Sequence, residues 1–189
     1  SIFWINLPMG ILAALLALWW REAERYNVLP LDDTLLARLL VERPRVFEPR
    51  DTYTYAGRVR LPRQGSPALR DCTYDLHAEV DVPDGGEGVI VSYGGTDGGI
   101  SLCLLDGHVH FVSNFLGREH TVVSSRTPVA PGPLTVDVAF ERTEPNAGHV
   151  RLSLDGELHA EADVAHTNPI AFSSSEGLEV GTVITFQDP

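Results

Sequence analysis

The histidine pair His108 and His110 is the first feature of the sequence that could do chemistry. The two residues lie two positions apart in a segment of alternating character, so their side chains share one face of a strand. A metal site would need a third ligand, for which His120 in the next segment is the candidate. Val109 and Phe111 take the core face, which leaves the histidines on the solvent face. A solvated strand therefore explains the pair more simply than a metal centre, and we predict no metal ligands.

Three aspartates also occupy suggestive positions. Asp97 lies in a glycine-rich loop, Gly94 to Gly99, and an aspartate with backbone carbonyls around it can ligate calcium. Asp32 and Asp33 are adjacent and could act as an acid pair. Asp97 is explained with fewer assumptions as a turn residue. For Asp32 and Asp33, one helix cap and one surface carboxylate are the simpler explanation.

Nucleophilic and phosphate-binding motifs are absent from the sequence. No serine stands in a Gly-x-Ser-x-Gly turn, and the glycine-rich loop joins two strand-like segments rather than a strand and a helix. The two cysteines, Cys72 and Cys103, are too few for a disulfide scaffold, and two free thiols are favoured over one bridge. We therefore predict no catalytic and no cofactor-binding residues in this chain.

Four aromatic residues of the strand-rich region could line a sugar-binding face. Because they are in period with the apolar positions, most are more simply core residues. They are Tyr93, Phe111, Phe115 and Phe140.

The charge of the chain is unevenly distributed. All 14 basic residues are arginine, and the formal net charge of the 189 residues is -12. Residues 1–70 carry 10 arginines against 7 acidic residues, whereas residues 71–189 carry 4 against 19. A region as acidic as the second repels nucleic acid and sulfated polymers, whose capture normally needs basic patches. We therefore expect no nucleic-acid partner.

Residues 2–20 form an uncharged apolar segment unlike the rest of the chain. As a helix it would be roughly 28 Å long, close to the thickness of the hydrocarbon layer of a membrane. Its string FWINLPMGI, Phe3 to Ile11, resembles a membrane helix of drug antiporters of the major facilitator superfamily. Three interpretations of this segment remain open. It is a membrane span, a helix buried against another part of the protein, or a foreign segment that results from a gene fusion or a mis-assembled gene fragment. Membrane association is expected if the segment inserts, and a cytoplasmic or periplasmic location otherwise.

The region that follows is predicted to be a helix and a linker. Helical composition continues from Leu12 to Tyr26, and Pro30 ends it. A short helix is predicted over Asp33 to Val41, followed by an extended linker. We thus divide the chain into a hydrophobic helix at 1–20, a helix and linker at 21–56, and a β-sandwich domain at 57–189.

From residue 57 onward the apolar residues recur with a period of two, which indicates strands with one face in a core. Asp106-Gly107 and Asp155-Gly156 each separate two such segments, as type I′ hairpins require. This pattern predicts a mainly β fold, an antiparallel two-sheet β-sandwich preceded by one N-terminal helix. The predicted strands are 57–61, 73–82, 88–93, 99–105, 108–114, 119–125, 134–142, 148–154, 157–163 and 178–183.

Strings spread over residues 19 to 181 resemble the C-terminal region of bacterial-type arylsulfatases, in the order in which they occur in that family. The longest is WWREAERYNVLPLDD, Trp19 to Asp33. The others are Tyr53-Thr54-Tyr55, Glu87-Gly88-Val89-Ile90, Gly98-Gly99-Ile100-Ser101-Leu102, Asp106-Gly107, Asn114-Phe115-Leu116-Gly117 and Glu176-Gly177-Leu178-Glu179-Val180-Gly181. The predicted sandwich is also similar to laminin-G and concanavalin-like jelly rolls.

The resemblance implies a part of a sulfatase without its active site. Sulfatases use a formylglycine made within a Cys/Ser-x-Pro/Ala-x-Arg motif, and neither Cys72 nor Cys103 stands in one. The family's calcium ligands would lie in a catalytic domain that this chain lacks. The resemblance therefore predicts a non-catalytic accessory domain, inactive alone, whose partner is a sulfatase catalytic domain. The alternative is a stand-alone carbohydrate-binding jelly-roll module, for which the acidic charge leaves neutral glycans open as ligands.

Overall fold

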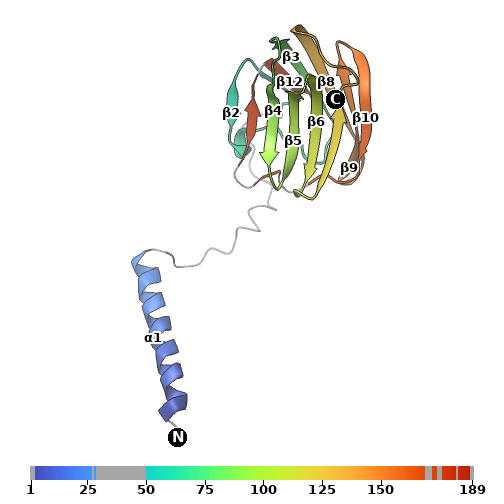
Figure 1. The fold of residues 1–189 in the computed structure, drawn as a ribbon. Helices are drawn as coiled ribbons and strands as arrows, with labels where there is room; N and C mark the ends of the chain where they lie inside the picture. The colour runs from blue at the N-terminus through green and yellow to red at the C-terminus, as the bar shows by residue number, and fades with distance from the viewer. Residues whose placement is uncertain are drawn as a thin grey trace. The chain divides into compact units, whose positions relative to one another are not determined.

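The computed structural model describes residues 3–26, 28, 50–168, 172–173, 176–181 and 183–187 (Figure 1). The chain divides into two compact units, residues 1–48 and residues 49–189. Among the described residues, the first unit contains one helix and the second contains the strands. The prediction of a mainly β chain with one N-terminal helix is confirmed.

Helix α1 extends from Phe3 to Arg25, in agreement with the helical composition of this segment. Its apolar side chains from Met9 to Trp20 are mostly exposed, and the rings of Trp19 and Trp20 contact each other edge to face. Residues 2–20 are predicted above as a candidate membrane span. Among the described residues, however, no helix is both long enough and apolar enough to cross a membrane. The short helix predicted at 33–41 lies outside the described residues.

The second unit is an antiparallel β-sandwich of two six-stranded sheets, as predicted. Sheet A has the order β1 (Thr52–Tyr55), β12 (Val183–Gln187), β3 (Tyr74–Val82), β8 (Gly132–Glu144), β9 (Ala147–Leu154) and β10 (Glu157–Val164). Sheet B has the order β2 (Val59–Leu61), β11 (Leu178–Val180), β4 (Gly88–Gly95), β5 (Gly98–Leu105), β6 (His108–Phe115) and β7 (Glu119–Ser124). A short 3₁₀ turn, Arg63–Gly65, follows β2.

Both predicted Asp-Gly turns join neighbouring strands. Asp106 and Gly107 link β5 to β6 with φ values of 50° and 75°, and Asp155 and Gly156 link β9 to β10 with 49° and 81°. Positive φ at both central residues is the geometry of a type I′ turn, whose twist matches that of the flanking strands. The turn chemistry thus fixes the register of both hairpins.

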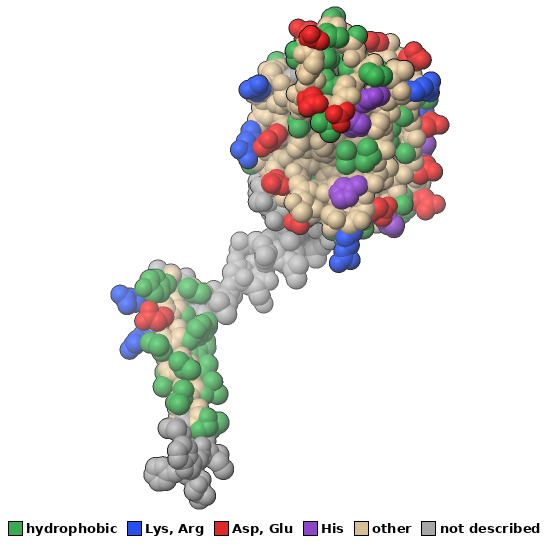
Figure 2. Space-filling model, viewed as in Figure 1, with side chains coloured by type: hydrophobic (Ala, Val, Ile, Leu, Met, Phe, Trp, Pro, Cys, Tyr) green, Lys and Arg blue, Asp and Glu red, His purple; other side chains and the backbone are tan. Residues whose placement is uncertain are grey.

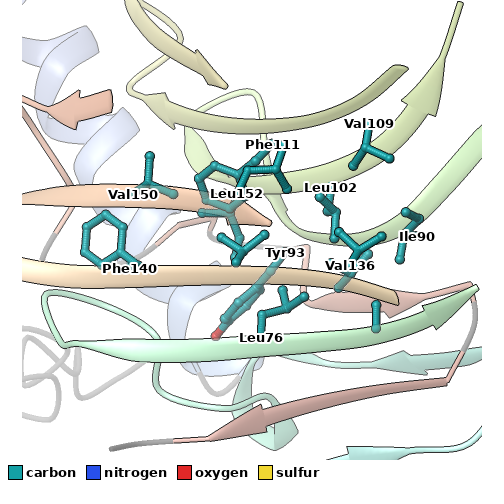
Figure 3. Packing of buried hydrophobic residues seen from close by; sticks show 14 of the residues in the cluster. Leu76, Ile90, Tyr93, Leu102, Val109, Phe111, Val136, Phe140, Val150 and Leu152 are labelled. Atoms are coloured by element: carbon teal, nitrogen blue, oxygen red, sulfur yellow. The ribbon is translucent and has the colours of Figure 1, made fainter. Parts of the chain in front are cut away.

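The core lies between the two sheets and consists of the apolar side chains that alternate along each strand. Figure 3 shows these side chains pointing toward one another from the two layers. From sheet A come Leu76, Val136, Phe140, Val150 and Leu152, and from sheet B come Ile90, Tyr93, Leu102, Val109 and Phe111. Because one face of every long strand is buried in this way, the opposite face of each sheet is left to solvent.

Two features of the strand pattern differ from the sequence-based prediction. Strand β1 lies in the segment predicted as a linker, where it pairs with β12 and packs the ring of Tyr55 against that of Phe186. The predicted strand 178–183 is two strands, because the chain leaves sheet B after β11 and joins sheet A as β12. The break falls at Gly181, where a Cβ atom would lie 2.4 Å from the carbonyl oxygen of Val89.

Candidate ligand-binding face

The outward side chains of strands β4 to β7 of sheet B form a surface without Arg, Asp or Glu, which we call the sheet B face. Register places them in rows that run across the strands. The rows are Leu105 and His108; Val89, Cys103, His110 and Ser124; Ser92, Ser101, Val112 and Val122; and Asn114 with His120. Figure 2 views the molecule from this side, with uncharged atoms and histidines over β4 to β6 and most arginines and acids around the edges.

The hydrogen bonds of the histidines hold this surface together across β6 and β7. His110 lies opposite Ser124, with 2.7 Å between its Nδ1 and the serine Oγ, and its Nε2 lies 3.3 Å from the carbonyl oxygen of Leu105. The Nδ1 of His108 lies 2.9 Å from the carbonyl oxygen of Ser125. These contacts fix two imidazole rings on the outward side of the sheet.

The remaining polar groups of the sheet B face carry no charge at neutral pH. Burial raises the pKa of the Cys103 thiol, which keeps it protonated. The outward charges of sheet B are an ion pair on the neighbouring strands, between Arg60 of β2 and Glu179 of β11, with 2.9 Å between Nε and Oε1. The part of the sheet from β4 to its edge strand β7 is therefore without Arg, Asp or Glu on its outward side, within a strongly acidic chain.

The outward face of sheet A has the opposite character. Carboxylates occupy most of its exposed positions on β3, β8 and β10, while Arg151 on β9 supplies a positive charge. These outward carboxylates are Asp75, Glu79, Asp81, Asp137, Glu141, Glu161 and Asp163. The two faces of one domain thus differ in charge, and the acidity of the chain is concentrated on sheet A.

Two histidines pair with carboxylates across the strands of sheet A. The Nδ1 of His77 lies 2.6 Å from Oδ1 of Asp137. The Nδ1 of His149 lies 2.7 Å from Oδ1 of Asp163, and its Nε2 lies 3.5 Å from Oε2 of Glu161. The hydrogen bond to Asp163 is the main cause that raises the pKa of His149, and Glu161 adds to it.

We expect His149 to make stability depend on pH. A histidine with a raised pKa in the folded state stabilises the protein below its unfolded pKa of about 6.5, and this contribution is lost as pH rises through the folded pKa. Because Asp163 is well exposed, the contribution is ~1 kcal/mol or less. Urea unfolding at pH 5.5 and pH 8.5 should show His149→Gln less stable than the natural chain only at the lower pH.

His120→Gln is the matched control for this measurement, because its cross-strand neighbour is Asn114 rather than a carboxylate. If His149→Gln loses the same amount of stability at both pH values, the ion pair with Asp163 is not the cause of that loss.

One end of the sandwich carries the glycine-rich loop, Gly94 to Gly99. Asn114 ties this end together: its amide nitrogen donates to the carbonyl oxygens of Gly95 (2.8 Å) and Thr96 (3.2 Å), and its Oδ1 accepts from the Gly117 amide (2.9 Å). Asp97 is exposed at the tip of the loop. Nearby, Phe115 is half-buried and stacks on His166, with 5.2 Å between ring centroids.

The cavity beneath this end has a volume of only about 10 Å³, which is room for no more than one water molecule. It lies between the sheets, with Tyr74, Phe140 and Phe172 in its wall. Among the described residues, this cavity is too small for a sugar ring, and the sheet B face is the better candidate for ligand binding.

The structure separates the residues proposed from sequence. His108 and His110 lie two residues apart on β6, but His120 of β7 pairs with Asn114, four residues further along β6 from His110. In the part of the chain that the structure describes, no group of three or more His, Cys, Asp or Glu residues is placed to hold a metal ion. Asp32 and Asp33 lie outside the described residues, and Cys72 and Cys103 are not joined by a disulfide bond.

The predicted assignment of the aromatic residues to the core is confirmed for three of four. Tyr93, Phe111 and Phe140 are buried, so the alternative that they line a sugar-binding face is wrong. Phe115 alone of the four is partly exposed. What sequence reasoning missed was the neutral surface as a whole. Its signal was present in the outward strand positions of residues 89–124, which carry Ser, His, Val, Leu, Cys and Asn side chains.

Comparison with known proteins confirms the fold and leaves the family undecided. No known family matches the chain in a comparison with family models, and no curated protein matches it in sequence. Among solved structures, it is similar to a point mutant of HCR/D, with a TM-score of 0.50, 12% identity and coverage of 73% of this chain and 38% of that one.

Two further solved structures are similar over the same share of the chain. They are the botulinum neurotoxin serotype D binding domain, with a TM-score of 0.48, and the serotype D ligand binding domain in complex with N-acetylneuraminic acid, with 0.47. Each is 12% identical to this chain, and each match covers 73% of this chain. The match covers 38% of the length of the first structure and 37% of the second. At this identity the likeness to solved structures shows the sandwich fold alone.

Proposed function

We propose that this chain is a non-catalytic, jelly-roll binding module whose sheet B face binds neutral glycans. The observation that carries the proposal is the neutrality of this face from β4 to β7 in a domain that is otherwise strongly acidic. A surface that serves only for solubility would be expected to share the charge of its surroundings. An uncharged polar surface suits a ligand that is itself uncharged and rich in hydroxyl groups.

The chemistry of the face fits a sugar in two respects. Ser92 of β4 and Ser101 of β5 lie opposite each other and offer hydroxyl groups that both donate and accept, and on its other side Ser92 lies opposite Glu179 of β11. Val112 and Val122 continue the same row and offer apolar surface to the C–H faces of a sugar ring. Polar groups that fix orientation, beside apolar groups that gain from burial, are the usual composition of such sites.

The serine–histidine contact on this face does not indicate hydrolysis. Ser124 and His110 are within hydrogen-bond distance, as a nucleophile and its base would be. The other nitrogen of His110, however, faces a backbone carbonyl oxygen rather than a carboxylate that would stabilise the imidazolium. The pair also lies on the open surface of a sheet, so water is not excluded from it.

Binding of the full chain to neutral oligosaccharides tests the proposal. We expect isothermal titration calorimetry to detect at least one ligand among cellohexaose, xylohexaose, mannohexaose and a dextran of similar length. Ser101→Arg places a charged side chain at the centre of the face and should weaken that binding by about tenfold or more, which is ~1.4 kcal/mol. Ser153→Arg, at an outward position of sheet A, is the matched control and should bind as the natural chain does.

A panel that shows no binding to the natural chain would contradict the proposed function. So would equal losses in Ser101→Arg and Ser153→Arg, since these would place the ligand elsewhere.

The accessory domain of an arylsulfatase is the second candidate function. It is favoured by the strings over residues 19 to 181 and by three aliphatic side chains on the sheet B face: Val89, Leu105 and Val122 are 54%, 48% and 53% exposed. Exposed apolar side chains that share a face can mark a protein interface. Gel filtration with a purified arylsulfatase catalytic domain tests it. A complex that Val122→Arg disrupts, together with no glycan binding, would favour this candidate over the first.

A further inference from the structure

Helix α1 has no polar side between Met9 and Trp20. Every side chain in this segment is apolar, and every residue of it is exposed. At about 3.6 residues per turn, the small residues of the segment gather on one side of the helix, and the large apolar side chains cover the rest of its circumference. Figure 2 shows apolar side chains along the helix, with charged ones toward its C-terminal end. The small residues are Gly10, Ala13, Ala14 and Ala17, and the large ones, which are 44% to 64% exposed, are Met9, Ile11, Leu12, Leu15, Leu16, Leu18, Trp19 and Trp20.

A helix that packs against one protein partner needs only one apolar stripe. Such a stripe is about 100° wide on a surface helix and narrower in a coiled coil, and the opposite side carries polar residues that face water. Between Met9 and Trp20, α1 has no side of that kind. A second copy of the chain, or a groove on another protein, would therefore leave apolar side chains in water. The interior of a lipid bilayer covers a helix on all sides at once, so it is the environment that this segment fits best.

The C-terminal end of α1 marks where this environment ends. Trp19 and Trp20 are the last residues of the apolar segment, and their rings meet edge to face with 5.1 Å between centroids. Indole rings are enriched at the interface between hydrocarbon and water, which accommodates both the apolar ring and its N–H group. The helix continues with charged residues from Arg21 onward, and Oε2 of Glu22 lies 4.0 Å from Nη1 of Arg25. Apolar, aromatic and charged zones therefore follow one another along α1 in the order in which a bilayer presents hydrocarbon, interface and water.

The apolar segment is long enough to enter a bilayer from one side. At about 1.5 Å per residue, the helix from Met9 to Trp20 is roughly 18 Å long, whereas the hydrocarbon layer is about 30 Å thick. The arginines and glutamates at positions 21, 22, 24 and 25 balance each other in charge, so this end favours no particular headgroup charge. Burial of apolar surface, rather than attraction between charges, is therefore the driving force for binding.

We propose that helix α1 is a membrane-binding element, which inserts the segment from Met9 to Trp20 into the hydrocarbon layer of a lipid bilayer and holds Trp19 and Trp20 at the interface. The charged residues that follow stay in water, and the chain tethers the second unit to the membrane. The inference is independent of the proposed function, because α1 belongs to the first unit and the sheet B face belongs to the second.

Vesicles of phosphatidylcholine test the proposal with the full chain. Trp4, Trp19 and Trp20 are the tryptophans of the sequence, and all belong to α1, so intrinsic tryptophan fluorescence reports on this helix alone. We expect the emission maximum to move to shorter wavelength as vesicles are added, and the chain to float with the vesicles in a density gradient. Because salt screens charges but not apolar contacts, binding should be equal at about 0.15 M and about 0.5 M sodium chloride.

The double variant Leu12→Glu with Leu16→Lys tests whether the apolar segment is responsible. Glutamate four residues before lysine supports a helix, and the pair leaves the net charge unchanged, so neither loss of the helix nor altered charge accounts for the result. Two charged side chains in the hydrocarbon layer should weaken binding to the vesicles by about a hundredfold or more. Leu158→Glu with Leu116→Lys is the matched control. Both of these leucines are exposed on the second unit, so this variant should bind as the natural chain does.

Three outcomes would overturn the inference. The first is a natural chain that does not float with the vesicles and whose tryptophan emission is unchanged. The second is binding that the α1 double variant leaves intact, or that both double variants weaken equally. The third is a stable oligomer in lipid-free buffer, measured by light scattering, which the α1 double variant dissociates and which does not bind vesicles; α1 would then pack against a second copy of the chain. None of these outcomes bears on glycan binding by the sheet B face.

Discussion

Phe111→Ala is expected to remove about 3–5 kcal/mol from the free energy of unfolding. The ring of Phe111 is fully buried, with 0% of its surface exposed, in the layer of side chains between the two sheets (Figure 3). Truncation loses the apolar transfer energy of the ring and leaves a cavity that a close-packed sandwich can only partly fill. Since domains of this size are stabilised by roughly 5–15 kcal/mol in total, the variant should be close to unfolding. Urea unfolding followed by fluorescence measures the loss.

Val122→Ala is the matched control for this substitution. Val122 lies on the adjacent strand β7 but points to solvent, so its truncation should cost ~0.5 kcal/mol or less. A loss in Phe111→Ala no larger than in Val122→Ala would mean that the faces of β6 are assigned the wrong way round. The sheet B face would then be the core face, and the proposed function would fail with it.

We expect Gly99→Ala to lower the free energy of unfolding by about 2–4 kcal/mol, which is the second largest loss after that of Phe111→Ala. Gly99 has a φ of 141°, which side chains rarely adopt, and a Cβ at this position would lie 2.1 Å from the carbonyl oxygen of Tyr93. That oxygen belongs to the backbone of the neighbouring strand, so it cannot move aside as a flexible side chain would. The β4–β5 hairpin must therefore open to admit a methyl group, and thermal unfolding should report the loss.

Gly65→Ala provides the comparison for a glycine without these constraints. Its added Cβ would meet only the ring of Pro62 at 3.9 Å, an ordinary contact, and the change should alter stability by ~0.5 kcal/mol or less. Gly99→Ala should also disturb Asn114, its partner on β6. Equal stability of the two variants would show that the hairpin does not have the close backbone approach described.

Local patterns in the sequence predict most of the strands and their two faces. Alternation along β3, β8 and β9 identified which side chains enter the core, because one residue in two must be buried against the other sheet. The Asp-Gly turns identified two hairpins, since few other residue pairs adopt positive φ at both positions. Strand β1 was missed because its partner, β12, comes from the opposite end of the domain, and no local pattern records such a pairing.

The candidate site depends on relations that the sequence does not contain locally. Each outward residue from Val89 to Ser124 is individually unremarkable as a solvent-facing position. Their meaning comes from the register that places Cys103, His110 and Ser124 in one row, and from the order of strands that excludes the carboxylates of residues 75–81 and 137–163 from the same surface.

The sequence alone determined the mainly β architecture, the solvent-facing position of His108 and His110, and the acidity of the second part of the chain. Each follows from periodicity or composition, which are properties of neighbouring residues. Only the tertiary structure decided that the acidity lies on one sheet and that the other sheet has a neutral face. Strand order and sheet pairing join residues far apart in sequence, and these non-local contacts form only when the two sheets pack on a common core.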